Sequence, residues 1–365
     1  MVNFWNKLNI SFLRSMGEKD GYVAFDIGSS SVKMVEAAAD KNGYRLLNVG
    51  LIPLPPGAVQ NNMVIEGPLV TEAIRSLIHE NGVRSSKVIS AVPGRAVIIK
   101  KIQMPRQDEA ELEANVEFEA NKLIPENLDN VNLDYQVLGY LDSGNKMEVL
   151  LVAVKKEIVN SFTEIIEAAG LTPAVMDVDY FAMENMYETN YPAESRGVVG
   201  LIHIGARYTS ITLLQNGLST FTGDLPIGGE EFTEHLRREL NVPTEAAETF
   251  KLTGALENKR GLDLAAILHP SVENFAEEIR RTLSLYGTIG SEEGEGLKSI
   301  YLSGGSAKVS GLSTLLQEIM GVPVSVAEPF GGFTVNKRVD RSYLAEAAPL
   351  FAVAAGLSIR RPEDK

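Results

Sequence analysis

A strand-turn-strand pattern occurs twice in this chain and restricts the folds that it can adopt. Residues 23–35 read VAFDIGSSSVKMV, and residues 199–211 read VGLIHIGARYTSI. In both segments an apolar run ends in Ile-Gly, a short polar turn follows, and a second apolar run begins. Internal repetition constrains the whole architecture, and a repeat this widely spaced is too long for a solenoid. The chain is therefore predicted to consist of two related halves.

Each repeat opens a pattern of three strands that is followed by helical patterns. Residues 21–54 predict three strands separated by tight turns, and residues 197–229 predict three more. Helical patterns fill roughly residues 230–288 of the second half. Mixed sheets covered by helices are typical of α/β domains, whose ligands bind at strand ends in a cleft.

A different pattern separates the two halves and predicts an inserted ββαββ subdomain at residues 86–150. Two strands flank the Pro93-Gly94 turn, an acidic helix ends at Pro125, and another strand pair follows. The acidic run at 108–119 is either a solvated helix face or a surface that binds a partner.

The remaining domain boundaries follow from the repeats and from the polar linker at 191–197. The predicted units are a leader at 1–20, a first domain at 21–85, 151–195 and 340–365, a second domain at 196–230 and 271–339, and a smaller helical subdomain at 231–270. Apolar residues of the leader recur at helical spacing. It is therefore either an amphipathic anchor for a membrane surface or partner, or a segment docked on its own domain.

Composition excludes several classes of function. The net charge of −14 argues against a non-specific hold on nucleic acid and against attraction to anionic lipid. The chain has no cysteine, which excludes disulfides and thiolate metal sites and is compatible with a reducing compartment. We find no apolar run near the roughly 20 residues that a membrane-spanning helix needs.

The two glycine turns predict a site for a polyphosphate. A small-residue turn between buried strands exposes consecutive backbone N–H groups, which form an anion-binding nest. Asp26 would face the same anion, and two negative groups require a bridging cation such as Mg²⁺. The nest residues are Gly28, Ser29, Ser30 and Ser31 in the first turn and Gly205, Ala206, Arg207 and Thr209 in the second.

A third glycine element, SGGSAKVSG at 303–311, follows a strand and precedes a helix. It matches neither the Rossmann nor the P-loop pattern. Glycines at this position would let an adenine ring or ribose lie against the backbone. The four histidines are scattered, and no G-x-S-x-G nucleophile elbow is present, so zinc and serine-hydrolase chemistry are unsupported.

The three elements in this order resemble the actin-like ATPase superfamily. The resemblance implies an actin-like, ribonuclease H-like duplicated fold, with two mixed-sheet domains around a nucleotide cleft. The insert resembles a subdomain shared by the FtsA and PilM families. Finer signatures resemble the PilM family of type IV pilus assembly proteins, among them VISAVPGRAVIIKKIQMP, LIPENLDNVNLDYQVLG and LPIGGEEFTEHLRREL.

The resemblance also implies roles for individual residues in binding ATP and Mg²⁺. Asp26 would orient the Mg²⁺ shell. The phosphate contacts would be Gly28, Ser29, Ser30, Ser31 and Lys33 on one side and Gly205, Ala206, Arg207 and Thr209 on the other. The nucleoside contacts would be Gly304, Gly305, Ser306, Glu248 and Lys251. For Glu248 and Lys251 an exposed i, i+3 ion pair is the competing interpretation.

One position departs from the superfamily pattern. Where the second turn usually begins with Asp, this chain has His203. A neutral imidazole does not replace a carboxylate on hard Mg²⁺, and the sequence offers no residue to position the attacking water. We therefore expect nucleotide binding with at most slow hydrolysis.

The resemblance implies a cytoplasmic ATP-binding adaptor in the type IV pilus inner-membrane assembly complex. Its partner would be the N-terminal cytoplasmic peptide of a bitopic PilN-type protein, held in a groove between the first domain and the insert. The strand at 96–102 offers an edge for such an extended peptide. Membrane association would be indirect. Contacts with other pilus components and motor ATPases, and an oligomer, are left open.

Two alternatives belong to other functional classes. One is an FtsA-like, filament-forming membrane tether, but the C-terminal sequence GLSIRRPEDK does not resemble the amphipathic membrane helix of that family. The other is a small-molecule kinase of the same superfold, since a fold alone does not fix the chemistry. A kinase would need a catalytic Asp aimed at an acceptor hydroxyl, and no segment indicates one.

Overall fold

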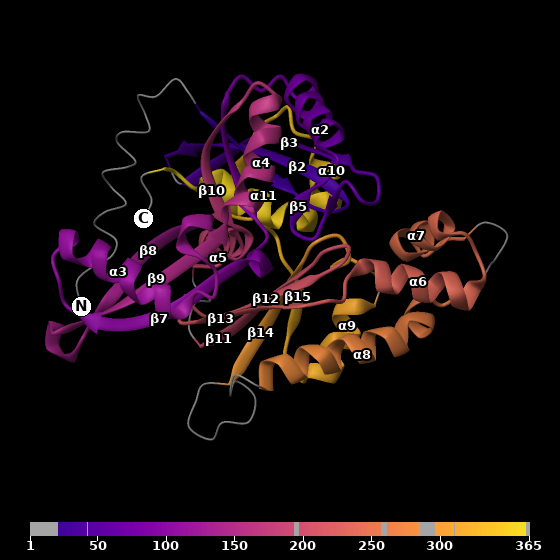
Figure 1. Ribbon diagram of the computed structural model, residues 1–365. Coiled ribbons are helices and arrows are strands. Elements are labelled where there is room, and N and C mark those ends of the chain that lie inside the picture. The colour runs from indigo at the N-terminus through magenta and orange to yellow at the C-terminus, as the bar shows by residue number, and fades with distance from the viewer. Residues whose placement is uncertain are drawn as a thin grey trace.

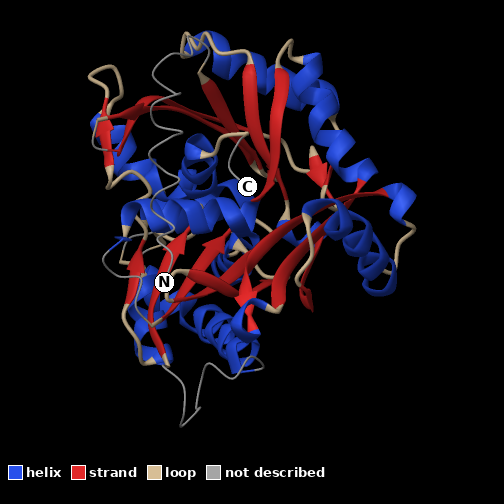
Figure 2. Cartoon of the chain, turned by 90° about the vertical axis from the view of Figure 1, so that its left-hand side faces the viewer, coloured by secondary structure: helices blue, strands red, loops and turns tan. Residues whose placement is uncertain are grey.

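Two mixed β-sheets, each built on one strand-turn-strand repeat, form the framework of the molecule (Figure 1). The computed structural model describes residues 21–41, 43–192, 197–256, 261–284, 296–309 and 311–362. The predicted leader at 1–20 and residues 193–196 of the predicted linker lie outside these ranges. Figure 2 shows the strands gathered into separate sheets with helices between and around them.

The first repeat forms the centre of a six-stranded sheet with the order β10-β6-β1-β2-β3-β16. Its strands are β1 (Tyr22–Ile27), β2 (Ser31–Asp40), β3 (Gly43–Pro53), β6 (Lys87–Val92), β10 (Thr172–Val178) and β16 (Phe333–Val335). β1 runs antiparallel to β2 and parallel to β6. Consecutive apolar residues bury β1 on both faces, as in a central strand with helices on either side.

The second repeat forms a five-stranded sheet with the order β13-β12-β11-β14-β15. Its strands are β11 (Val198–Ile204), β12 (Thr209–Gln215), β13 (Leu218–Leu225), β14 (Leu297–Ser303) and β15 (Val324–Val326). β11 is antiparallel to β12 and parallel to β14, so the pairing repeats that of β1 with β2 and β6. The duplication expected from the sequence is therefore present in the sheet topology.

The insert is a three-stranded sheet covered by one helix. It consists of β7 (Val97–Pro105), α3 (Glu109–Leu123), β8 (Val131–Leu141) and β9 (Lys146–Lys155), with the strand order β7-β9-β8. Leu112, Val116 and Ala120 of α3 pack on Val149 and Leu151 of β9 in a separate small core. Glu111, Glu113 and Glu117 of this helix are exposed.

The predicted ββαββ insert at 86–150 is wrong in its first strand. β6 pairs with β1 and β10, so it belongs to the six-stranded sheet, and the insert sheet extends to the end of β9 at Lys155. Val88 and Ile89 are fully buried, and only a strand covered on both faces can bury neighbouring residues in this way. β16, predicted within the second domain, also pairs with β3. The other predicted boundaries stay predictions.

Helices cover both faces of the six-stranded sheet. α2 (Gly67–Glu80) and α4 (Lys156–Ala168) pack on the face that carries Val23 and Phe25. α5 (Asp179–Asn190) and α11 (Ala352–Ile359) pack on the opposite face. A small hairpin of β4 (Val59–Gln60) and β5 (Met63–Val64) packs into the same core as α2 and α4.

The second half has its own set of helices and its own core. They are α6 (Gly229–Leu240), α7 (Thr244–Thr253), α8 (Leu264–Ser284) and α9 (Leu312–Met320). Phe232, Phe250 and Phe275 from three of these helices are fully buried against Ile202 and Ile211 of the sheet. Figure 1 shows these helices at the far end of the molecule from the insert.

α5 and α11 cross at backbone contact and help to join the two sheets. A Cβ atom at Gly356 would overlap the backbone carbonyl of Ala182, so glycine is required at this crossing. The same core cluster includes Val199 and Leu201 of β11. The helix pair therefore forms one continuous core with both sheets.

One described helical stretch, Arg341–Ile359, is long and apolar enough to cross a membrane by length and composition. It comprises α10 (Arg341–Ala347), the short helix η6 (Ala348–Phe351) and α11. The sequence analysis missed this run because Glu346 and Pro349 interrupt it. Since 67% of the apolar window is buried inside the protein, it serves as a core helix here.

Candidate functional site

The first glycine turn, residues 28–30, joins β1 to β2 and is held by backbone hydrogen bonds. The Gly28 N–H donates to the Ser31 carbonyl at 3.0 Å, and the Leu54 N–H donates to the Ser30 carbonyl at 2.8 Å. Ser30 is exposed and Ser29 is half-buried, whereas Ser31 is buried at the start of β2. Of the three predicted serine contacts, Ser29 and Ser30 are the accessible ones.

Asp26 and Lys33 form an ion pair beside this turn. They are register partners on β1 and β2, and the Lys33 Nζ lies 3.0 Å from the Asp26 Oδ2. Their side chains are 15% and 11% exposed. The Lys33 ammonium also lies 3.2 Å from the position that a Cβ of Gly28 would occupy, so it is at the turn itself. A partly buried pair of this kind is costly to break by removing one partner.

The second glycine turn joins β11 to β12 and carries the beginning of α6. The Gly205 N–H donates to the Tyr208 carbonyl at 2.9 Å and closes the turn. The N–H groups of Gly229 and Glu230 donate to the carbonyls of Gly205 and Ala206, both at 2.8 Å. The first residues of α6 are therefore fixed directly to the turn.

Side chains of the second turn differ in burial, since Arg207 is half-buried and Thr209 is buried. Thr209 is fully buried, and its hydroxyl donates to the Ile227 carbonyl at 2.7 Å. Arg207 pairs with Glu230, with 3.4 Å between Nε and Oε1. A hollow of about 190 Å³ lies beside the turn and is lined by Ala206, Arg207, Tyr208, Pro226, Ile227, Gly228, Glu230 and Glu231.

The third glycine element presents one open position. Gly304 has a φ of +89°, and its N–H donates to the Pro349 carbonyl at 2.8 Å. A Cβ at Gly305 would meet no atom within 4 Å, so this residue faces open space. Ser306 is 3% exposed and packs against Gly229. Of the three predicted nucleoside contacts here, Gly305 is the accessible one.

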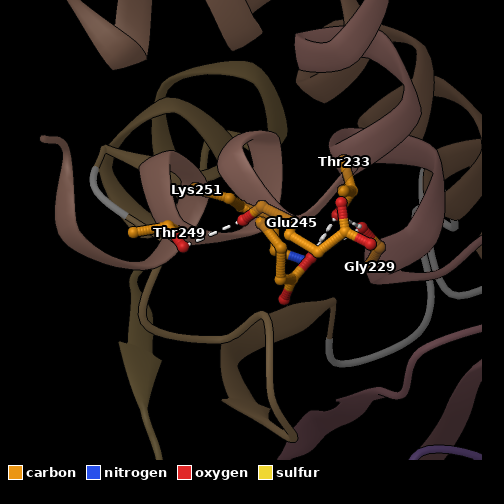
Figure 3. A network of polar contacts seen from close by, with 6 residues as sticks. Gly229, Thr233, Glu245, Thr249 and Lys251 are labelled. Atoms are coloured by element: carbon orange, nitrogen blue, oxygen red, sulfur yellow. Dashed lines mark hydrogen bonds and ion pairs between the residues drawn. The ribbon is translucent and has the colours of Figure 1, made fainter. Parts of the chain in front are cut away.

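Lys251 forms a buried polar network that links α7 to α6 (Figure 3). Its Nζ donates to the Gly229 carbonyl at 3.1 Å, the Thr233 hydroxyl at 2.8 Å and the Glu248 carboxylate at 2.7 Å. The Lys251 side chain is 5% exposed, whereas that of Glu248 is 45% exposed. The competing interpretation of a fully exposed pair is therefore wrong for the lysine. Lys251 fixes α7 to the start of α6, and the Glu248 side chain stays accessible.

These elements meet around Gly229. A Cβ there would overlap the Ser306 hydroxyl and lie 3.4 Å from the Lys251 Nζ and 3.6 Å from the Gly205 carbonyl. The second turn, the start of α6, α7 and the third glycine element thus form one corner. The structure brings these predicted residues together, although they come from distant parts of the sequence.

His203 connects this corner electrostatically to the first turn. Desolvation lowers its pKa to about 4, while the Asp26 carboxylate raises that pKa and the Lys33 ammonium lowers it. A hydrogen bond of 3.0 Å joins its Nδ1 to the Ser303 hydroxyl. His203, at the end of β11, therefore lies within electrostatic range of the Asp26–Lys33 pair beside the first turn. At neutral pH the imidazole is uncharged.

Asp179, the first residue of α5, is a site residue that the sequence analysis missed. Its Oδ1 accepts the Gly94 N–H at 2.8 Å. Burial, and after it the nearby Asp224 carboxylate, raises the pKa of this carboxyl to about 8. It lines a small cavity of about 10 Å³ with Tyr180, Met183, His203, Ser210 and Val353. The sequence did offer one indication of a site here: Asp179 directly follows the strand β10, and ligands of α/β domains bind at strand ends.

Replacing Asp179 by Asn is expected to stabilise the protein, and more so at pH 8 than at pH 5. The unfolded chain releases the proton near the ordinary aspartate pKa of 3.8, whereas the folded protein keeps it up to about pH 8. Wild-type stability therefore falls as the pH rises through this window. Asn still accepts from Gly94 but cannot ionise. We expect a gain of about 2 kcal/mol at pH 8, measured by urea unfolding.

The exposed carboxylate Asp134 supplies the matched control for this experiment. Asp134→Asn should follow the wild-type pH profile. An Asp179→Asn variant whose stability runs parallel to that of the wild type from pH 4 to 8 would contradict the assignment.

Comparison with known proteins agrees with this geometry. The duplicated mixed sheets, the two glycine turns and the third glycine element define an actin-like ATPase fold. The model of the family described as type IV pilus assembly protein PilM matches residues 24–362, and the chain belongs to that family. The fold class and the family predicted from the sequence are both confirmed.

Individual relatives support the same placement. A solved structure described as a PilM-PilN type IV pilus biogenesis complex is 30% identical, with a TM-score of 0.82, and the match covers 94% of this chain and 99% of that chain. The cell division protein FtsA of Bacillus subtilis (strain 168) is 23% identical over 363 residues, covering 86% of this chain and 80% of FtsA. The ethanolamine utilization protein EutJ from Carboxydothermus hydrogenoformans is 17% identical with a TM-score of 0.56, which shows the fold alone.

Proposed function

We propose that this chain is a cytoplasmic, ATP-binding adaptor of the type IV pilus assembly complex at the inner membrane. In this role it binds the N-terminal peptide of a PilN-type protein and reaches the membrane through that partner. The observation that carries the proposal is the match to a solved PilM-PilN complex over nearly the whole chain. The FtsA-like tether is less well supported, because the PilM family matches residues 24–362, whereas FtsA of Bacillus subtilis is 23% identical and that of Staphylococcus epidermidis 21%.

The two glycine turns support ATP as the nucleotide. Its phosphates would lie between the backbone of the first turn with Lys33 and the backbone of the second turn. Gly305 would face the nucleoside, because a Cβ there meets open space, and the accessible carboxylate of Glu248 would reach the ribose. Neither contact requires the buried network of Lys251 to open.

Mg²⁺ fits this site only together with the nucleotide. Among the residues that the structure describes, no group of three or more His, Cys, Asp and Glu side chains could hold a metal ion. Asp26 is the carboxylate beside the first turn. Phosphate oxygens and waters would supply the other ligands, as they commonly do for Mg²⁺.

Slow hydrolysis is the expected catalytic property. His203 is uncharged at neutral pH, so it does not supply the carboxylate expected at the start of the second turn. The pKa of Asp179 is raised to about 8, so this carboxyl keeps its proton at pH 7 and is a poor acceptor for a proton from water. An adaptor that holds ATP for long periods agrees with both features.

Apolar side chains between the insert and the first half support a groove for the peptide. Val97 and Ile99 on β7 lie directly opposite Val154 and Val152 on β9, so all four share one face of the insert sheet. They pack on the core of the first half but stay partly exposed. Partly buried residues on the first half are Val159, Met176 and Phe181.

β7 also offers an edge for strand addition. In the described part of the chain it pairs with β9 alone. An extended peptide could pair with this edge and place alternate side chains against the apolar face. The N-terminal segment of a bitopic protein is suited to such binding, because it can extend from the membrane to a soluble partner.

Calorimetric titration of ATP tests the nucleotide site. Asp26→Ala should remove the Mg²⁺-dependent part of the affinity, because the metal loses its one protein carboxylate. Gly305→Val should weaken binding at least about tenfold, since its branched side chain would occupy the space proposed for the nucleoside, a loss of about 1.4 kcal/mol or more.

Gly305→Ala is the matched control, because a single methyl group meets no atom within 4 Å. It should bind ATP more tightly than Gly305→Val does. Wild-type affinity in both Asp26→Ala and Gly305→Val would show that ATP does not bind at this site.

A further inference from the structure

The short helix η2 (Gly94–Ala96) connects β6 of the six-stranded sheet to β7 of the insert. Its first residue is held tightly on α5. The Gly94 N–H donates to Asp179 at 2.8 Å, and a Cβ at Gly94 would overlap the ring of Tyr180. The base of the insert therefore has a defined position on the first half.

The next residue of η2 contacts the second glycine turn. The Arg95 guanidinium lies 3.3 Å from the centroid of the Tyr208 ring, within the range of a cation–π interaction. Tyr208 belongs to the turn itself, because its carbonyl accepts the Gly205 N–H at 2.9 Å. A single stacking contact thus joins the proposed phosphate-binding turn to Arg95, which lies just before β7 begins at Val97.

Further polar contacts join the same two regions. The Tyr180 hydroxyl donates to Asp224 of β13, which also accepts from the Ser210 hydroxyl of β12 at 3.1 Å. On β7, the Lys101 Nζ donates to the Ser219 carbonyl of β13 at 2.6 Å. The insert and its base are therefore held against the β12–β13 edge of the second half.

We propose that the Arg95–Tyr208 contact couples ligand binding at the second turn to the position of β7, and so to the affinity for the peptide. This inference rests on the proposed nucleotide and peptide sites. ATP that shifts the second turn would shift Tyr208, and the stacked Arg95 would either follow or lose its partner. Both results change the edge and apolar face that β7 presents to the peptide.

Thermodynamic linkage makes the effect reciprocal. If ATP changes the affinity for the peptide by some factor, the peptide changes the affinity for ATP by the same factor. The coupling requires that each ligand favours one arrangement of the contact, since a ligand with equal affinity for both arrangements shifts nothing.

Peptide binding with and without ATP measures the coupling. The probe is a fluorescent synthetic peptide with the sequence of the cognate PilN-type N-terminal segment, titrated with the full chain in Mg²⁺ alone and in saturating Mg²⁺-ATP. For the wild type we expect the two dissociation constants to differ at least about fivefold. Arg95→Met keeps an unbranched side chain but removes the guanidinium. This variant should still bind ATP and the peptide. Its dissociation constants for the peptide with and without ATP should differ by no more than about twofold.

Three variants complete the set. Tyr208→Phe keeps the aromatic face and should keep the coupling. Tyr208→Leu removes that face and should lose the coupling, which provides a second test if Arg95→Met does not fold. Arg106→Met removes a contact of the same type, with Tyr140 at 4.9 Å inside the insert, and should couple as the wild type does.

Two results overturn the inference alone. One is unchanged coupling in Arg95→Met and Tyr208→Leu, and the other is a wild type that binds both ligands without any mutual effect. A wild type that binds no ATP or no peptide overturns the proposed function, and the inference with it.

Discussion

Removal of the insert sheet is expected to abolish peptide binding and to leave ATP affinity within about threefold of the wild type, which is less than 1 kcal/mol. The insert supplies β7 and half of the proposed apolar groove, whereas both glycine turns lie outside it. The deletion should take out residues 98–153, because the retained ends Val97 and Val154 are direct partners on β7 and β9. Their Cα atoms are about 5 Å apart, so a two-residue linker closes the gap. Fluorescence anisotropy and calorimetry measure the two affinities.

The position of the deletion matters for its interpretation. A deletion beginning at residue 86 would remove β6 from the six-stranded sheet and unfold the first half. The control replaces the β8–β9 turn at Asp142–Gly144 by Gly-Asn-Gly, since Asp142 and Ser143 have φ values of 49° and 56°. This variant should bind the peptide normally. Peptide binding that survives the deletion would place the groove elsewhere on the molecule.

Gly356→Ala is expected to lower the free energy of unfolding by about 3 kcal/mol, at the upper end of overpacking effects in cores. The new Cβ would overlap the Ala182 carbonyl where α11 crosses α5, so the two helices must separate. The sign of the change in unfolding free energy is the test, because a Gly→Ala change in an open helix stabilises a protein by up to about 1 kcal/mol. Urea unfolding supplies the measurement.

Gly305→Ala serves here as the control for stability. It adds the same methyl group at a position without neighbours, and its free energy of unfolding should stay within about 0.5 kcal/mol of the wild-type value. A Gly356→Ala variant as stable as the wild type would mean that the two helices are farther apart than described.

Much of the secondary structure could be predicted from the sequence because its strands and helices carry regular apolar patterns. The three strands of each repeat, α2, α3, α4 and the two long insert strands were all expected, and the structure confirms them. β15 and β16 were not expected, because three-residue strands are too short to show a periodicity. The assignment of β6 to the insert failed for a related reason: a strand sequence does not specify which sheet the strand joins.

The candidate site was partly predictable on similar grounds. Glycine turns are visible in a sequence, so the two turns and Gly305 could be identified. Burial was not visible: Lys251 was expected at the ligand, but packing of α7 on α6 encloses its ammonium. Asp179 was missed because its raised pKa comes from burial and from Asp224, a residue distant in the sequence.

The order in which the chain is synthesised does not match the order in which its cores can close. The last strand and last helix of the first half, β16 and α11, lie near the C-terminal end of the described chain and complete a sheet that begins at β1. The core of the second half contains only residues from Val198 to Val326, so it can close earlier. At about 5–20 residues per second, a ribosome needs roughly 15 s to 1 min to pass from β3 to α11. During this interval Ala24, Val35 and Ala37 are not yet covered by α11. The nascent first half therefore keeps this apolar surface uncovered until α11 has been synthesised.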